Sequence, residues 1–278
     1  MSSLKRRFLE LVHNPPAEVV KAQQELLARA DRRAELASNG IVPASLDVVV
    51  AGSGFLSLYY LGVQTVVSRI KGTKCERFSG ASSGAQAPLE LMLTGEAATL
   101  NSYLVHGYLC GDQWLGSAML SADSHWKALG ADMMEKHASE LNKLDGKCFV
   151  SVTRWTRRGP KNHLYSQWSA MGPKLAAEAF YATGTALTKC DGYWCSDGGA
   201  TLNEPLFSDA PPGRGTLIVR PTRSGLPMRM ACGYSFEQAI KAIELGQDDA
   251  VAMLLRDPPP AALGLYDRAR TPDLPPDP

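Results

Sequence analysis

Apolar residues in this chain fall into short runs and longer periodic stretches that alternate along the sequence. The run Leu46–Val50 is rich in valine and bounded by Gly52, which predicts a buried strand. Further strands are predicted at Phe149–Thr153 and Leu217–Val219, and an apolar helix at about Leu56–Ile70. This alternation of strand and helix predicts an α/β domain with a largely parallel, covered sheet.

The pattern divides the chain into three segments. Residues 1–40 predict a helical arm with one apolar stripe. Residues 41–256 predict the main domain, whose last helix begins after Ser235 and is interrupted at Gly246. Residues 257–278 hold seven of the 18 prolines and little apolar sequence, so a disordered tail is expected.

Composition excludes several classes of protein. Over 278 residues, 45% hydrophobic and 21% charged residues are typical of a globular chain. The 29 basic and 28 acidic residues nearly cancel, so no nucleic-acid partner is expected. No apolar run approaches the roughly 18 residues of a membrane span, and the N-terminus lacks the apolar core of a signal peptide. The basic start Lys5–Arg7 could touch an anionic membrane, but a helix packed on the domain is the stronger interpretation.

The segment Gly80-Ala81-Ser82-Ser83-Gly84 matches the pattern G-x-S-x-G. Its glycines permit a sharp turn between a strand and a helix, which lifts the serine hydroxyl out of the backbone. The N–H groups at the start of the following helix would then point at an oxyanion formed there. The pattern therefore indicates Ser82 as a candidate nucleophile, although such a pentad also arises by chance.

A second glycine-rich turn, Gly52-Ser53-Gly54, directly follows the valine-rich strand. Small residues there expose several backbone N–H groups, which makes the turn a candidate anion-binding site. Dinucleotide binding is the alternative interpretation. It needs a third glycine where the chain has Ser57 and an acidic residue near the basic stretch Lys71–Lys74, so it is disfavoured.

A third motif is Asp197-Gly198-Gly199, which taken alone predicts only a turn between strands. In order with the other two motifs it resembles the patatin-like phospholipases, which carry a glycine-rich oxyanion loop, G-x-S-x-G and D-G-[GA]. The sequence resembles most closely the adipose triglyceride lipase and adiponutrin branch of that family, and the resemblance lies in the segments Ala51–Val63, Gly80–Gly84 and Asp197–Leu206. The resemblance covers roughly residues 45–255.

The resemblance implies a patatin-like three-layer α/β/α fold and a carboxylic ester hydrolase. In that family pattern Ser82 is the nucleophile and Asp197 its sole partner, so a Ser–Asp dyad forms and hydrolyses an acyl-enzyme. The backbone of Gly52, Ser53 and Gly54 forms the oxyanion hole. The remaining motif glycines support these turns: Gly80, Gly84, Gly198 and Gly199.

Two expectations about the dyad depend on its surroundings. An aspartate with the ordinary pKa of ~3.9 is a weak base, so the site must raise that pKa, and Tyr193 and Trp194 are expected to supply dry surroundings. Ser57 replaces the last glycine of the family's oxyanion motif. That departure keeps open an alternative, a catalytically weak or inactive patatin-fold protein that binds lipid surfaces. A water-soluble esterase or acyltransferase of the same fold is a third hypothesis.

The substrate class follows from the resemblance, which implies long-chain acyl esters of phospholipid or triacylglycerol. We expect a cytoplasmic protein that works at a membrane or lipid-droplet surface, without a transmembrane span and without a cofactor. The stretch 103–126 is dense in aromatic and aliphatic residues. It could wall an acyl channel, although ordinary helix core is the stronger interpretation.

The cysteines and histidines add two further expectations. The six cysteines are scattered without a C-x-x-C pair and are expected to be reduced thiols. His106 and Cys110 come closest to a ligand cluster, but zinc needs more ligands, so no metal site is expected. All five histidines precede Asp197, an order that fits none of the familiar Ser-His-Asp triads and favours a dyad.

Overall fold

The computed structural model describes residues 3–37, 40, 43–110, 115–185, 187–209, 211, 213–255 and 262–267. Within these ranges a single eight-stranded sheet forms from β1 (Ser45–Val50), β2 (Lys74–Ala81), β3 (Cys148–Thr156), β4 (Gly159–Tyr165), β5 (Thr188–Cys190), β6 (Tyr193–Asp197), β7 (Gly215–Val219) and β8 (Leu263–Asp267). The α-helices of the same ranges are α1 (Ser3–His13), α2 (Ala17–Ala37), α3 (Ser57–Val67), α4 (Ser83–Thr94), α5 (Glu96–Cys110), α6 (Leu115–Lys136), α7 (Trp168–Ala182) and α8 (Phe236–Leu254).

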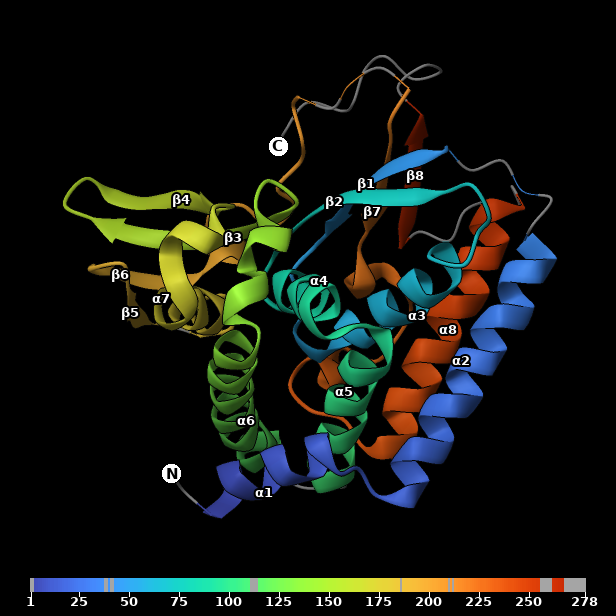
Figure 1. Ribbon diagram of the computed structural model, residues 1–278, viewed down its shortest axis with the longest axis horizontal. Helices are drawn as coiled ribbons and strands as arrows, with labels where there is room; N and C mark the ends of the chain where they lie inside the picture. Colours follow the sequence, from blue (N-terminus) through green and yellow to red (C-terminus); the bar gives the residue numbers. More distant parts are fainter. Residues whose placement is uncertain are drawn as a thin grey trace.

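The centre of the sheet is parallel. β1 pairs in parallel with β2 on one side and with β7 on the other, and β2 pairs in parallel with β3. Antiparallel pairs are added by β4, β5, β6 and β8. The predicted fold class, a three-layer α/β/α domain with a largely parallel central sheet, is confirmed, and Figure 1 shows α3, α4 and α8 packed along the sheet.

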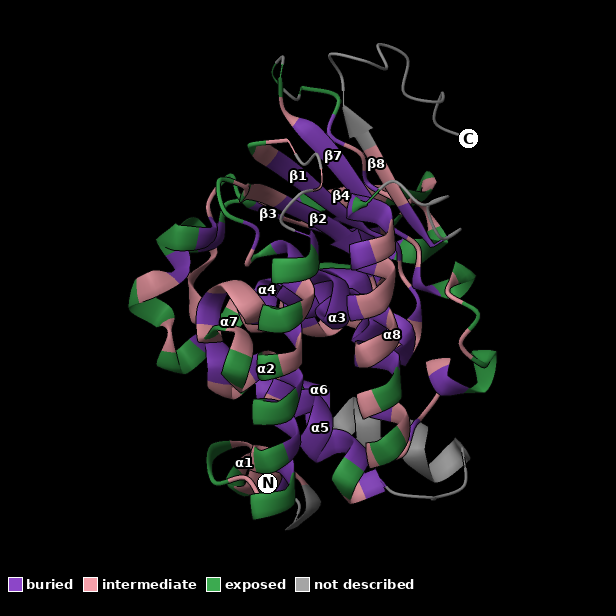
Figure 2. Ribbon diagram, turned by 90° about the vertical axis from the view of Figure 1, so that its right-hand side faces the viewer, coloured by how far each residue is buried: buried purple, intermediate pink, exposed green. Residues whose placement is uncertain are grey.

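The two faces of the sheet bury different amounts of apolar surface. Val48 and Val50 belong to the main core, which they share with α3, α4 and α8. Val49 and Ile218 point the other way and form a smaller cluster with Phe207. Figure 2 shows the central strands and α3 almost entirely buried. Burial on both faces explains why β1 is an apolar run instead of an alternating one.

The two N-terminal helices belong to the same core as the sheet. Phe8 of α1 and Val19 and Ala30 of α2 are fully buried in the main core. The outer side of α2 is held to α8 by an ion pair between Arg29 and Asp248 at 2.8 Å. The expected helical arm is therefore a packed layer of the domain. No helix in the described ranges combines the length and apolar character that crossing a bilayer requires.

Two features near the C-terminus correct the sequence analysis. Helix α8 continues through Gly246, where the expected interruption is absent. The glycine allows α3 to approach, since a Cβ there would lie 2.1 Å from the carbonyl oxygen of Tyr59. In the expected disordered tail 257–278, the segment 263–267 instead forms β8, because a strand with a buried Leu263 covers the open edge of β7. The rest of that tail lies outside the described residues.

Candidate active site

Ser82 occupies a sharp turn between the end of β2 and the start of α4. Its backbone has φ 55° and ψ −139°, a conformation that residues other than glycine rarely adopt. A Cβ at Gly80 would lie 2.2 Å from the carbonyl oxygen of Gly84, and a Cβ at Gly84 would lie 2.5 Å from that of Val50. The turn therefore requires both glycines, and the strand–turn–helix context of a nucleophile elbow is present.

The sheet brings Asp197 to Ser82 through the register of β3. On one edge of β3, Ser151 pairs with Ala81 at the end of β2, and the next residue, Val152, pairs with Asp197 at the end of β6. Strand β4 occupies the other edge. Because β2 is parallel to β3 and β6 is antiparallel to it, the carboxyl ends of β2 and β6 meet at this position.

Asp197 is held in place and partly desolvated. Its Oδ1 accepts a hydrogen bond of 2.8 Å from the N–H of Gly199, and the hydroxyl of Ser82 lies near the same carboxylate. Burial raises the pKa of Asp197 above its usual range, although the nearby Ser82 hydroxyl and the Gly199 N–H act in the opposite direction. A carboxylate with a raised pKa is better suited to accept a proton from a serine than an ordinary aspartate.

The source of this desolvation differs from the expected one. Tyr193 and Trp194 are 45% and 51% exposed, so the expectation that they keep Asp197 dry is wrong. They lie in the β5–β6 hairpin at the edge of the sheet. The guanidinium of Arg154 lies over one face of the Tyr193 ring, and the ammonium of Lys189 lies over one face of the Trp194 ring. Asp197 is shielded by its place at the inner end of β6, between β3 and the Ser82 turn.

The predicted oxyanion loop lies beside Ser82, between β1 and α3. Gly54 has φ +56°, and a Cβ on it would clash with the neighbouring backbone, so this position requires glycine. The N–H of Gly52 donates a hydrogen bond of 3.1 Å to Oδ1 of Asn203. Of the three loop residues, the backbone N–H groups of Ser53 and Gly54 therefore remain as candidate oxyanion donors, together with that of Ser83 at the start of α4.

Asn203 is a site residue that the sequence analysis did not single out. Its Oδ1 lies near Gly199 of the Asp-Gly-Gly motif and accepts the hydrogen bond from Gly52. The side chain thus connects the motif that carries Asp197 to the oxyanion loop. Its place six residues after Asp197 is the only signal in the sequence, and its partner is fixed by the fold.

Ser57 is compatible with the backbone it occupies. It begins α3 with φ −57° and ψ −18°, an ordinary right-handed helical conformation. A third glycine is therefore not needed at this position for the loop to form. The residue is fully buried and lines the pocket next to Ser82.

A pocket of about 340 Å³ opens beside Ser82. This volume lies within the range of small-molecule sites, and most of the wall is apolar. Its lining combines the two turns with aromatic side chains from α5, α6 and α7: Gly54, Phe55, Ser57, Ser82, Ser83, Gln86, Tyr103, Trp126, Tyr181, Gly184, Thr185, Ala231 and Cys232. The candidate nucleophile therefore lies in a partly open, largely apolar pocket.

The described part of the aromatic stretch 103–126 contributes to the core and to the pocket. Tyr103, Leu104 and Trp126 all belong to the main core, and Tyr103 and Trp126 also line the pocket. Tyr108 is 39% exposed. Residues 111–114 and the side chains of 115–124, which the stretch also includes, lie outside the described residues.

His163 is separated from Asp197 by an intervening strand. It lies on β4 and pairs with Val152 of β3, whose other edge pairs with Asp197. Two strand spacings separate the backbones of the two residues by about 9–10 Å, and the carboxylate of Asp197 accepts its hydrogen bond from Gly199. Two other histidines, His13 and His137, contact acidic residues of α6 and of the segment that follows it.

The fold and the site geometry define an α/β protein with a serine at a strained strand–helix turn and a carboxylate partner. No protein-family model and no curated protein matches this chain. Its class therefore has to be inferred from the geometry.

Proposed function

We propose that this chain is a serine lipid acyl hydrolase of the patatin-like type, with Ser82 as nucleophile and Asp197 as base. One juxtaposition carries the proposal. The strained serine turn and the glycine-rich loop both line one largely apolar pocket, and the partly desolvated carboxylate of Asp197 lies behind the serine turn, next to Ser82. Strain and an incompletely stabilised carboxylate are features that a purely structural turn has no need to keep.

The reaction would proceed in two steps. Ser82 Oγ attacks the ester carbonyl carbon while its proton passes to Asp197, and the leaving alcohol takes up that proton as the acyl-enzyme forms. A water molecule, deprotonated by the same carboxylate, then attacks the acyl-enzyme, and Asp197 returns that proton to Ser82 Oγ as the fatty acid leaves. In both steps the oxyanion would be held by the N–H groups of Ser53 and Gly54, where one such donor contributes about 3–4 kcal/mol.

The walls of the pocket favour an acyl chain over a polar substrate. Phe55, Tyr103 and Trp126 line the same pocket as Ser82, which suits an acyl chain whose ester lies at the serine. Phospholipid and triacylglycerol share this ester chemistry, and both would be presented at a membrane or lipid-droplet surface.

The structure does not support the one feature that favoured an inactive lipid-binding protein, the replacement of glycine by Ser57. That alternative rested on Ser57 as an unfavourable replacement for glycine. The helical backbone at Ser57 gives no reason for the loop to be defective, so turnover is the better-supported proposal.

Turnover of a long-chain chromogenic ester by Ser82→Ala and Ser83→Ala proteins tests the proposal. Ser82→Ala should lose turnover by ~10³-fold or more, as loss of a member of a catalytic unit does. Ser83→Ala is the matched control, because Ser83 lines the same pocket and its buried hydroxyl has no hydrogen-bond partner within the described structure. It should keep near-normal turnover, and a lipid panel offered to the wild type should then separate phospholipid from triacylglycerol hydrolysis.

Equal activity in the Ser82→Ala and wild-type proteins would contradict the proposed nucleophile. Hydrolysis of soluble short-chain esters without hydrolysis of either lipid would agree with Ser82 as the nucleophile but contradict the proposed lipid substrate.

A further inference from the structure

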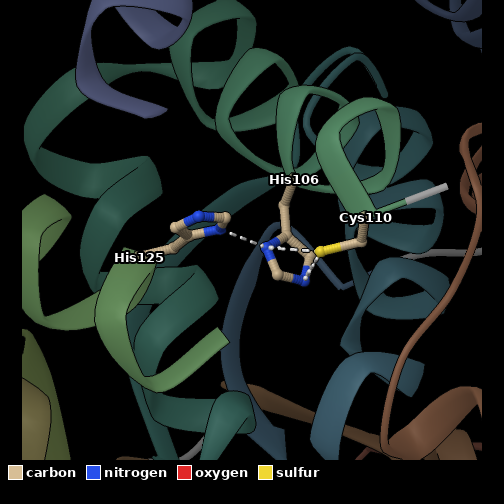
Figure 3. A group of neighbouring side chains, drawn as sticks. All are labelled: His106, Cys110 and His125. Carbon is tan, nitrogen blue, oxygen red and sulfur yellow. Dashed lines mark hydrogen bonds between the residues drawn. The ribbon is translucent and has the colours of Figure 1, made fainter. Parts of the chain in front are cut away.

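Three side chains of the kinds that bind transition metals meet between α5 and α6, outside the candidate active site. His106 and Cys110 are one helical turn apart on α5, and His125 faces them from α6, as Figure 3 shows. One potential ligand atom from each lies within 4.8 Å of the others. The sequence analysis considered only the pair on α5, because the approach of His125 depends on how the two helices pack.

Two of the separations are close to those of ligand atoms that share one ion. Nδ1 of His106 lies 2.9 Å from Nδ1 of His125, and Sγ of Cys110 lies 3.5 Å from Nε2 and 3.8 Å from Nδ1 of His106. Metal–nitrogen bonds of about 2.0–2.1 Å and metal–sulfur bonds of about 2.3 Å put neighbouring ligand atoms roughly 3–4 Å apart. Because Sγ is nearer to Nε2 than to Nδ1 of His106, an imidazole ring would have to turn for one ion to reach all three side chains.

The polar atoms of this cluster are buried and incompletely paired. His106, Cys110 and His125 are each at most 2% exposed. In the hydrogen bond between the two Nδ1 atoms one ring donates and the other accepts, and in either arrangement Nε2 of His125 has no partner within the described structure. Buried polar groups are normally paired, and a turn of the His125 ring would let this unpaired Nε2 bind an ion in place of Nδ1.

Aromatic rings surround the cluster and exclude water. Phe8 is stacked on His125 with ring centres 4.3 Å apart, and Phe55 is stacked on His106 at 4.7 Å. These ring contacts hold both imidazoles in fixed orientations, and imidazole nitrogen is the commonest protein ligand of transition metals.

We propose that His106, Cys110 and His125 form a site for one monovalent copper ion. Charge favours this ion, because a cuprous ion with one thiolate is neutral, whereas a divalent ion would leave a net positive charge among apolar rings. Ligand number and type agree. Structural zinc sites usually have four protein ligands, of which the described residues supply three, and thiolate selects soft ions such as cuprous copper.

The site is close to the pocket and independent of the proposed hydrolase activity. Phe55 and Trp126 line the pocket, and both rings also pack on His106. A bound ion would fix the imidazole of His106 and with it this wall of the pocket. Neither Ser82 nor Asp197 takes part, so failure of either proposal leaves the other standing.

Anaerobic transfer of cuprous ion from its bicinchoninate complex to the intact chain tests the site. The wild type should take up one ion per chain, and the X-ray absorption spectrum of the complex should show one sulfur and two nitrogen ligands. Cys110→Ser should weaken binding by about 100-fold or more, since even the loss of an outer-sphere partner costs 10–100-fold. Cys148→Ser is the matched control, because Cys148 is equally buried but is absent from the histidine cluster, and it should bind copper as the wild type does.

Thermal unfolding separates loss of binding from loss of folding. Copper should raise the midpoint of the wild type and of Cys148→Ser, but not that of Cys110→Ser, whose midpoint without metal shows whether it is folded. Equal copper affinity of the Cys110→Ser protein and the wild type, or a spectrum without sulfur, would overturn the site. Displacement of the bound copper by an equal concentration of Zn²⁺ would overturn the assignment to a monovalent ion.

Discussion

Asp47 and Asp197 belong to the same sheet but have opposite surroundings. Asp47 in β1 is fully buried and accepts hydrogen bonds of 3.0 and 2.6 Å from the guanidinium of Arg77, with Arg214 at 3.3 Å. Asp197 at the end of β6 accepts a hydrogen bond from the backbone N–H of Gly199 and lies near the hydroxyl of Ser82, and neither group carries a charge.

The difference shows how a structural carboxylate can be told from a candidate catalytic one. The negative charge of Asp47 is compensated by two cations, and its bond to Arg77 is the main cause that raises the pKa of that guanidinium. Burial raises the pKa of Asp197 instead, and its neighbour Ser82 has a strained backbone. We propose that the charge of Asp47 is structural and that of Asp197 is reactive, and each of the following experiments tests that contrast.

Replacing the reactive carboxylate should have the largest effect on turnover. Asp197→Asn keeps the shape of the side chain but removes the base, so ester turnover should fall by ~10³-fold or more. The free energy of unfolding at pH 7 should be equal to or higher than that of the wild type, since a buried charge is lost. Turnover of a chromogenic ester and urea unfolding measure the two quantities. Near-normal turnover of the Asp197→Asn protein would mean that the Asp-Gly-Gly motif is only a turn between strands.

Replacing the compensated carboxylate should have the reverse effect. Asp47→Ala leaves the guanidiniums of Arg77 and Arg214 without their buried partner and should cost roughly 3–5 kcal/mol in the free energy of unfolding. Turnover per folded molecule should stay near the wild-type value, because Asp47 contacts neither Ser82 nor the pocket lining. Asp209→Ala is the control, since Asp209 also pairs with Arg77 but its side chain is 74% exposed, and its loss should change stability little. A larger effect of Asp209→Ala than of Asp47→Ala would contradict the contrast.

The raised pKa of Asp197 predicts a pH dependence of both rate and stability. Turnover should fall on acidification with a midpoint above the ordinary aspartate value of ~3.9, because the base must be ionised. A carboxyl whose folded-state pKa is raised contributes stability below its unfolded pKa, and that contribution is lost as pH rises through the folded value. The stability of Asp197→Asn relative to the wild type should therefore increase between pH 3 and pH 7. A rate profile with an imidazole-like midpoint near 6.5 that persists in Asp197→Asn would point to a different base.

The smallest effect is expected at the nearest histidine of the sheet. His163 lies across β3 from Asp197, so His163→Ala should keep at least about a tenth of wild-type turnover. A hundred-fold loss of turnover in a folded His163→Ala protein would indicate a catalytic triad that includes His163 instead of the dyad. Steady-state kinetics on the same ester are sufficient, with circular dichroism as the check on folding.

The regions of this structure that the sequence predicted are those governed by local pattern. The apolar runs at Leu46–Val50 and Leu217–Val219 became β1 and β7, and the glycines around Ser82 form the turn that their spacing indicated. What could not be predicted depends on packing between distant segments. The bond from Gly52 to Asn203 is one such contact, and the approach of His125 to Cys110 is another.

Exposure was a further limit of the sequence, because a local pattern does not tell which aromatic residues a fold will cover. Trp194 was expected near a buried site but lies on an edge hairpin, and the segment 263–267 was expected to be disordered because of its proline-rich context. In both cases the position of neighbouring strands decided the outcome.

The central claim is that Ser82 is an activated nucleophile, and covalent labelling tests it most directly. Wild-type protein treated with a long-chain alkyl fluorophosphonate, digested and mapped by mass spectrometry should carry the label on Ser82. The label should be absent from Ser82→Ala, strongly reduced in Asp197→Asn and retained in Ser83→Ala. Labelling of the wild type at another serine, or no labelling of a folded wild-type protein, would contradict the account.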